Sequence, residues 1–177
     1  AVATLLERLA VAAIPLDYGS LVRLSGREEQ EAAADLAACV GSQLLERTPM
    51  QTELYQFRHS LTREAIASEI PALRARRLHL EVAEALEAGG GGPRAAMLSR
   101  HFAAAGERVR ALRYAREGAE HAKGVGAFPA AIDLLRQAVD LAAGSDEAPA
   151  VLEELASALR AAGRAAEARE ALERARA

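Results

Sequence analysis

The sequence is poor in several residue types, and each shortage excludes a class of protein. Aromatic residues make up 3% of the 177 residues, and tryptophan is absent. The single cysteine, Cys39, cannot form an internal disulfide, which fits a reducing compartment and predicts a cytoplasmic location. Cys39 also lies within an apolar run, residues 36–40, so we expect a buried structural thiol and not a catalytic one.

Long apolar runs are also missing. No stretch of about 18 uncharged apolar residues occurs, so we expect no contact with a membrane. Residues 2–16 contain Glu7 and Arg8 and lack a small-residue cleavage pattern, so they do not resemble a signal peptide. The chain begins without methionine, directly on an amphipathic pattern, and we therefore expect it to be an internal fragment of a longer protein.

Alanine and leucine supply much of the 51% hydrophobic content. Both are strong helix formers, and small side chains let helices pack closely, so the composition predicts a mainly α fold. Four consecutive glycines followed by Pro93 cannot hold a helix or strand without a large entropic cost. We expect domains at 1–88 and 94–177, joined by a glycine-rich linker at 89–93.

The first part combines helices with one hairpin. Its predicted helices begin with one stopped at Pro15, one capped by Asp17 and ending near Gly26, and a third running to about Val40 and ended by Gly41. The spacing of Ser25 and Glu28 suggests a capping box for the third helix. Residues 43–48 and 53–58 predict a two-stranded wing around a turn at 49–52, and two further helices are expected at 59–69 and 73–87. This order describes a winged-helix unit with a helical extension.

The second part shows helical periodicity throughout and contains an internal similarity. Residues 126–138 align with 163–175, 37 residues apart, with Gly, Ala, Leu and Ala at matching offsets. Gly106 with Ala111 gives a similar start, but at a spacing that suggests only an irregular half-repeat. The glycine is expected to end one helix and the first alanine to mark a close helix contact. These features predict about five antiparallel helices in a short tetratricopeptide-like solenoid.

Residues 55–66, which include the run Phe57-Arg58-His59, and the later segments 74–79 and 82–86 resemble large bacterial regulators. These are the LuxR-type and related regulators built on a STAND-class signal-transduction ATPase. The resemblance implies an ATPase core before a winged helix, repeats after it, and a DNA-binding domain at one end. Any ATP or ADP would therefore bind mainly outside this fragment.

The resemblance also implies one cofactor-binding residue. Related STAND proteins carry a histidine, in a Met-His-Asp motif, that contacts the β-phosphate of ADP, and His59 occupies the comparable place. Arg58 and Ser60 stand here where that motif has Met and Asp. An imidazole can donate a hydrogen bond to phosphate. The alternative is that His59 only caps or packs the following helix.

Charges argue against direct nucleic-acid contact by this fragment. The net charge is −3, and the third predicted helix carries four carboxylates, Glu28, Glu29, Glu31 and Asp35, against one Arg27. A DNA reader would need Lys, Arg, Asn or Gln there. The one basic cluster is Arg74, Arg76 and Arg77, which could meet phosphate, an acidic protein or the ATPase core, although such runs are more often solvated helix faces.

Signs of catalysis or metal binding are lacking. Pro93-Arg94 follows the glycines where a phosphate loop needs Lys and Ser or Thr, and the four histidines are widely spaced without cysteine partners. We therefore predict no enzyme and no metal site. The predicted role is a regulatory and protein-interaction module that couples the ATPase core to signal sensing; the alternative is a stand-alone interaction scaffold. An exposed last face of Ala171, Leu172 and Ala175 favours a homodimer through the repeats.

Overall fold

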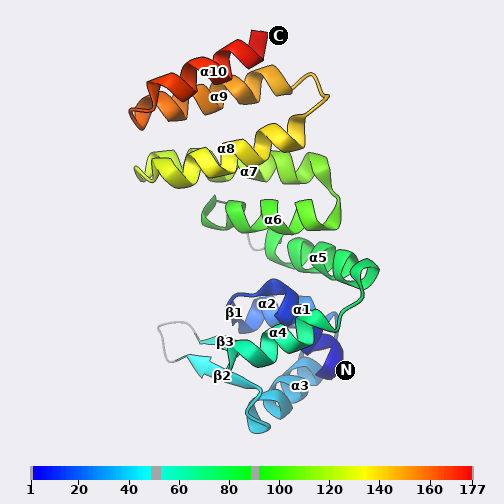
Figure 1. Cartoon of the computed structure of the whole chain (residues 1–177). Coiled ribbons are helices and arrows are strands. Elements are labelled where there is room, and N and C mark those ends of the chain that lie inside the picture. The colour runs from blue at the N-terminus through cyan, green and yellow to red at the C-terminus, as the bar shows by residue number, and fades with distance from the viewer. Residues whose placement is uncertain (1, 49–52, 89–91, 177) are drawn as a thin grey trace. The chain divides into compact units, whose positions relative to one another are not determined.

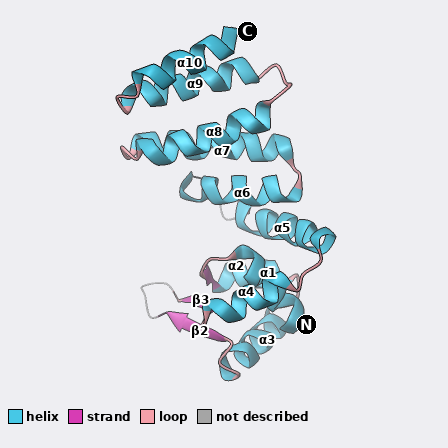
Figure 2. Ribbon diagram, in the orientation of Figure 1, coloured by secondary structure: helices cyan, strands magenta, loops and turns pink. Residues whose placement is uncertain are grey.

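The computed structural model describes residues 2–48, 53–88 and 92–176. Within these residues the fold is mainly helical, with ten α-helices and one small three-stranded antiparallel sheet (Figure 1, Figure 2). The predicted mainly α class is therefore confirmed. The chain divides into two compact units, Ala1–Gly89 and Gly90–Ala177.

The first unit holds α1 (Val2–Ala12), β1 (Leu16–Asp17), α2 (Tyr18–Ser25), α3 (Glu29–Gly41), β2 (Leu45–Thr48), β3 (Leu54–Phe57), α4 (Ser60–Ser68) and α5 (Ala72–Glu87). The second holds the 3-10 turn η1 (Gly92–Arg94), α6 (Ala95–Ala105), α7 (Arg108–Gly124), α8 (Phe128–Ala142), α9 (Ala148–Ala161) and α10 (Ala165–Arg176).

Helix α1 lies at the centre of the first unit. It packs against all four other helices of the unit and against β3. Its side chains Leu5, Leu6 and Leu9 are buried, as the spacing of these leucines predicted. Burial of apolar surface around α1 is therefore the main stabilising contribution in this unit.

Helix α2 begins and ends as the sequence predicted. Asp17 Oδ1 accepts a hydrogen bond of 2.9 Å from the Ser20 amide, and Gly26 closes the helix at φ +64°. The expected capping box for the next helix is wrong. The Ser25 hydroxyl donates to the Val22 carbonyl at 2.7 Å and accepts from the Arg27 amide, so it serves the end of α2 instead of the start of α3.

The sheet has one strand more than expected. Strands β2 and β3 form the predicted antiparallel pair, with Leu45 opposite Phe57. Strand β1 pairs with the other edge of β3, placing Leu16 opposite Tyr55, so the prediction of only two strands is wrong. A strand of two residues is too short to show an alternating pattern, and its pairing depends on β3 lying nearby. The predicted turn at 49–52 lies outside the described residues.

The glycine-rich segment falls at the boundary between the units. Residues 89–91 lie outside the described residues. Gly92 and Pro93, predicted as linker, lie in η1, and the Gly92 amide donates a 2.7 Å hydrogen bond to Glu117 of α7. These two residues are therefore attached to the second unit.

The five helices of the second unit follow one another in space as they do in sequence, each packing on the next (Figure 1). Contacts also join alternate helices. From α8, Gln137 donates to Ser99 of α6 at 3.2 Å, and Arg136 pairs with Glu167 of α10 at 2.9 Å. From α7, Arg116 pairs with Glu147 at the start of α9 at 3.1 Å. Side chains therefore link α6 with α8, α7 with α9, and α8 with α10.

Three of the helix turns share one geometry. Gly106, Gly126 and Gly163 all adopt positive φ, between 76° and 81°. At each, the glycine amide bonds the carbonyl three residues back and the next amide bonds the carbonyl five residues back. The alanine five residues after each glycine is buried, as predicted. The spacing from Gly106 to Gly126 is short because only α7 lies between these two glycines. Both α8 and α9 lie between Gly126 and Gly163.

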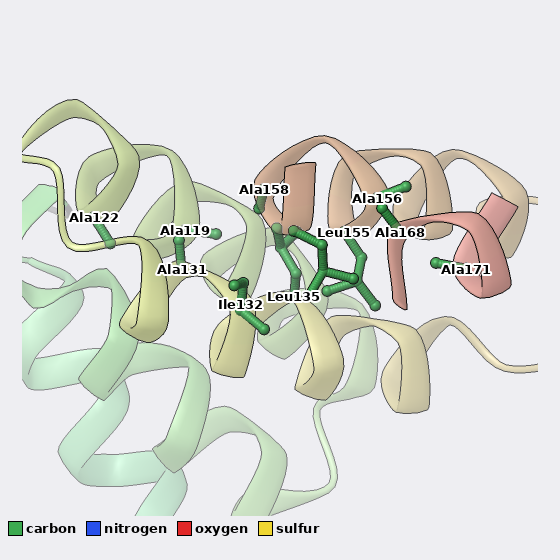
Figure 3. Close-up of a cluster of buried hydrophobic side chains, with 11 residues drawn as sticks. Ala119, Ala122, Ala131, Ile132, Leu135, Leu155, Ala156, Ala158, Ala168 and Ala171 are labelled. Carbon is green, nitrogen blue, oxygen red and sulfur yellow. The ribbon is translucent and has the colours of Figure 1, made fainter. Parts of the chain in front are cut away.

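Alanines and leucines from α7 to α10 form a continuous apolar cluster (Figure 3). Ala131, Ile132 and Leu135 of α8 and Leu155 and Leu159 of α9 all belong to this cluster, and all five are buried. Ala171 of α10 is buried there too, and Leu172 packs against it. The expectation that Ala171 forms part of an exposed last face is therefore wrong, because α9 already covers it.

Candidate functional site

His59 lies where the sheet passes into α4. Its backbone is extended, with φ −127° and ψ 126°, and its carbonyl accepts hydrogen bonds from Thr62 at 3.1 Å and Arg63 at 3.3 Å. The residue thus begins the helix through its backbone. Its imidazole makes no capping hydrogen bond and is exposed, so the side chain is available to a ligand or partner.

A shallow cleft of about 210 Å³ lies beside this junction. One wall comes from Leu9 and residues 13–15, and the other from Gln56, Phe57, Ser60 and Arg63. Pockets that enclose a small molecule usually measure about 300–1,000 Å³. The cleft is too small to enclose a nucleotide, so any nucleotide reached by His59 would be held mainly by another surface.

The basic cluster is largely engaged within the first unit. Arg74 of α5 donates to Glu7 of α1 through Nε at 3.0 Å, and Arg77 pairs with Glu81 one turn further along α5 at 3.1 Å. Glu81 also pairs with Arg8 of α1 at 2.7 Å. These ion pairs join α1 to α5, which favours a structural role for Arg74 and Arg77 over phosphate binding.

Helix α3 keeps its acidic character in the folded chain. Arg27, the cation just before it, pairs with Asp35 at 2.6 Å and with Glu31 at 3.0 Å. The side chains of Glu28 and Glu29 are exposed. The surface offered by the first half of α3 is therefore negative, as the sequence indicated.

Cys39, in the last turn of α3, is fully buried, which confirms the sequence prediction. Burial raises the pKa of its thiol, and the nearby carboxylate of Asp35 raises this pKa further. Since the thiolate is the reactive form, both effects suppress reactivity.

We expect Cys39 in the native protein to react with Ellman's reagent at least about 100-fold more slowly than in guanidinium chloride. The matched control is Ala37→Cys combined with Cys39→Ala, which moves the thiol to an exposed position on the same helix. This control should react fast in the native protein. Equal native rates for the two proteins would contradict the burial of Cys39.

The second unit offers a groove that bridges three helices. It measures about 340 Å³ and is lined by Arg136, Val139, Asp140, Leu155, Leu159, Glu167, Glu170, Ala171 and Arg174 from α8, α9 and α10. Its floor is apolar and its rim carries both signs of charge. Hydrogen bonds from Arg164 and Arg136 lower the pKa of Glu167, so this carboxylate stays ionised in the rim. Sequence reasoning missed this groove, because residues from three helices meet in it only after folding, among them Arg136 and Glu167, which are 31 residues apart.

The described residues contain neither a candidate metal site nor a helix that could span a membrane. No group of three His, Cys, Asp or Glu side chains that could hold a metal ion occurs in these ranges. The four histidines are dispersed over the cap of α4 and over α5, α6 and α7. None of the described helices is long and apolar enough to span a membrane.

Comparison with known proteins gives no relative: no protein-family model, curated protein or solved structure matches the chain. The function must therefore be inferred from the residues themselves and from the resemblance of residues 55–66.

Proposed function

We propose that this chain is a regulatory and protein-interaction module of a bacterial transcription regulator of the LuxR type, built on a STAND-class ATPase. In this proposal the first unit is a winged helix, and the second is a tetratricopeptide-like solenoid. The module couples an ATPase core elsewhere in the polypeptide to signal sensing by the repeats. It acts in the cytoplasm, a reducing compartment in which a single cysteine such as Cys39 remains a free thiol.

The observation that carries the proposal is the exposed imidazole of His59 at the junction of β3 and α4. The resemblance assigns nucleotide contact to a histidine after the last strand of the winged helix, and His59 has both the position and the exposure for that role. The small size of the adjacent cleft fits a contact made at the edge of another domain.

The acidic surface of α3 supports a role for this module other than DNA binding. In a winged helix that reads DNA, the third helix enters the major groove, where carboxylates would repel phosphate. Here Arg27, the cation next to α3, is already paired with Asp35 and Glu31. The module therefore transmits a signal, and another domain contacts DNA.

Replacement of His59 by Ala in the full-length protein is expected to weaken binding of a fluorescent ADP analogue by about tenfold, because one hydrogen bond to a charged group is lost. Fluorescence anisotropy measures this directly. His121→Ala is the matched control, since His121 is also exposed but belongs to the second unit. Unchanged ADP affinity in the His59 variant would refute the nucleotide contact.

The second candidate is a stand-alone interaction scaffold, favoured by the groove across α8, α9 and α10. An apolar floor with a charged rim suits a helix or extended peptide. Crosslinking to a partner separates the two candidates. The scaffold requires crosslinks confined to residues 95–177, whereas the regulatory module also requires crosslinks near His59.

A further inference from the structure

Helix α4 is covered on one side only. It packs against α1 and β3, yet none of its nine residues is buried. Leu61 in its first turn is 76% exposed, and Leu73, in the first turn of the next helix, α5, is 85% exposed. Short helices depend on tertiary packing for their stability, so an uncovered face on α4 is energetically unfavourable.

The uncovered face is small and apolar at its centre. Leu61 and Ala65 lie one turn apart on the same side of α4, and both are exposed. The small side chain of Ala65 leaves room for a leucine from another helix. The centre of this face therefore fits the close approach of a second helix.

Charges on α4 are arranged against its own dipole. Arg58 precedes the helix and Arg63 lies in its first turn, whereas Glu64 and Glu69 follow towards its C-terminal end. A helix dipole favours the opposite order, acidic first and basic last. Arg63 and Glu64 pair with each other at 3.1 Å. Arg58 and Glu69 form no ion pair with any part of the chain that the structure describes.

The charges along α4 are complementary to those of a second, antiparallel copy of the same helix. An antiparallel copy of α4 would bring its acidic end to Arg58 and its basic end to Glu69, which would compensate both unfavourable ends at once. A two-fold axis makes each such contact occur twice. A partner of uniform charge could satisfy only one of the two ends.

We propose that α4 is a self-association surface, on which α4 of a second copy of this chain packs antiparallel about a two-fold axis near Arg63. Leu61 packs on Ala65 of the second copy, and Arg58 pairs with Glu69 of the second copy. A nine-residue helix provides a small interface, so the dimer is weak, with a dissociation constant of about 10–500 µM. This proposal is independent of the nucleotide contact of His59.

Sedimentation velocity of the chain from about 5 to about 1,000 µM tests the proposal, since mass action populates a weak dimer only at high concentration. The unaltered chain should change from monomer to mainly dimer across this range. Arg58→Glu and Glu69→Arg should each weaken the dimer about tenfold, because each places like charges opposite one another. The double variant Arg58→Glu/Glu69→Arg should restore the original association, because it recreates both pairs with reversed signs.

Two further variants examine the apolar centre. Leu61→Ser should abolish the dimer, whereas Val125→Ser, at a 68% exposed valine in the second unit, should leave it unchanged. Far-UV circular dichroism confirms that each variant is folded. The proposal is overturned if the chain stays monomeric at the highest concentration, or if the double variant associates no better than either single one. It is also overturned if Leu61→Ser still dimerises, since the contact would then lie on another surface such as the repeats.

Discussion

Replacement of Phe102 by Ala is expected to lower the free energy of unfolding of the second unit by about 3–5 kcal/mol. Phe102 of α6 is fully buried, and its ring stacks on Tyr114 of α7 with centroids 5.6 Å apart. The guanidinium of Arg110 lies 3.9 Å above the same ring. The substitution removes a large apolar side chain, an aromatic stack and a cation–π contact at one position.

Urea denaturation followed by far-UV circular dichroism measures this loss. Phe128→Ala is the matched control, because Phe128 opens α8 and is only half-buried. We expect this control to lose about 1–2 kcal/mol, in proportion to its smaller buried area. Equal losses for the two variants would contradict a central role for Phe102 in joining α6 to α7.

The second large effect is expected at Gly118, in the middle of α7. A Cβ atom there would lie 3.0 Å from the Ala96 amide nitrogen of α6 and 3.2 Å from Leu134 Cδ1 of α8. The backbone of Ala96 cannot rotate away as a side chain could. We therefore expect Gly118→Val to lower the free energy of unfolding by about 3 kcal/mol, despite the gain in helix propensity.

Gly124 provides the control for Gly118, because it lies in the same helix and a Cβ atom added there would meet nothing within 4 Å. Gly124→Ala should raise stability by up to about 1 kcal/mol, through helix propensity alone. Gly118→Ala should lack this gain and lower stability. Equal stabilisation by both alanine variants would show that α6 and α7 do not approach closely at Gly118.

The candidate site was only partly predictable. The place of His59 between a strand and a helix could be predicted, because local sequence determines where β3 ends and α4 begins. Its exposure could not be derived, since exposure depends on what α1 and β3 cover. The pairing of Arg74 with Glu7 was likewise hidden, because 67 residues separate the two side chains.

The sequence by itself determined where the helices lie and where several of them end, because these features depend on local chemistry. Asp17 caps α2 with its own side chain, and Gly126 and Gly163 take the left-handed conformation that other residues avoid. Periodic alanines and leucines defined which helix faces are buried. These features depend on neighbours within a few residues, so they are visible without a structure.

Only the tertiary structure decided which distant elements meet. It paired β1 with β3, brought Gln137 to Ser99 and Arg136 to Glu167, and buried Ala171 in the cluster that α9 shares. It also showed that Arg108 of α7 donates to the Ala143 carbonyl just after α8 at 2.6 Å. Such contacts arise when many apolar side chains from distant parts of the chain are buried together. The free energy of this burial depends on all of these segments at once, so it cannot be read from any one of them.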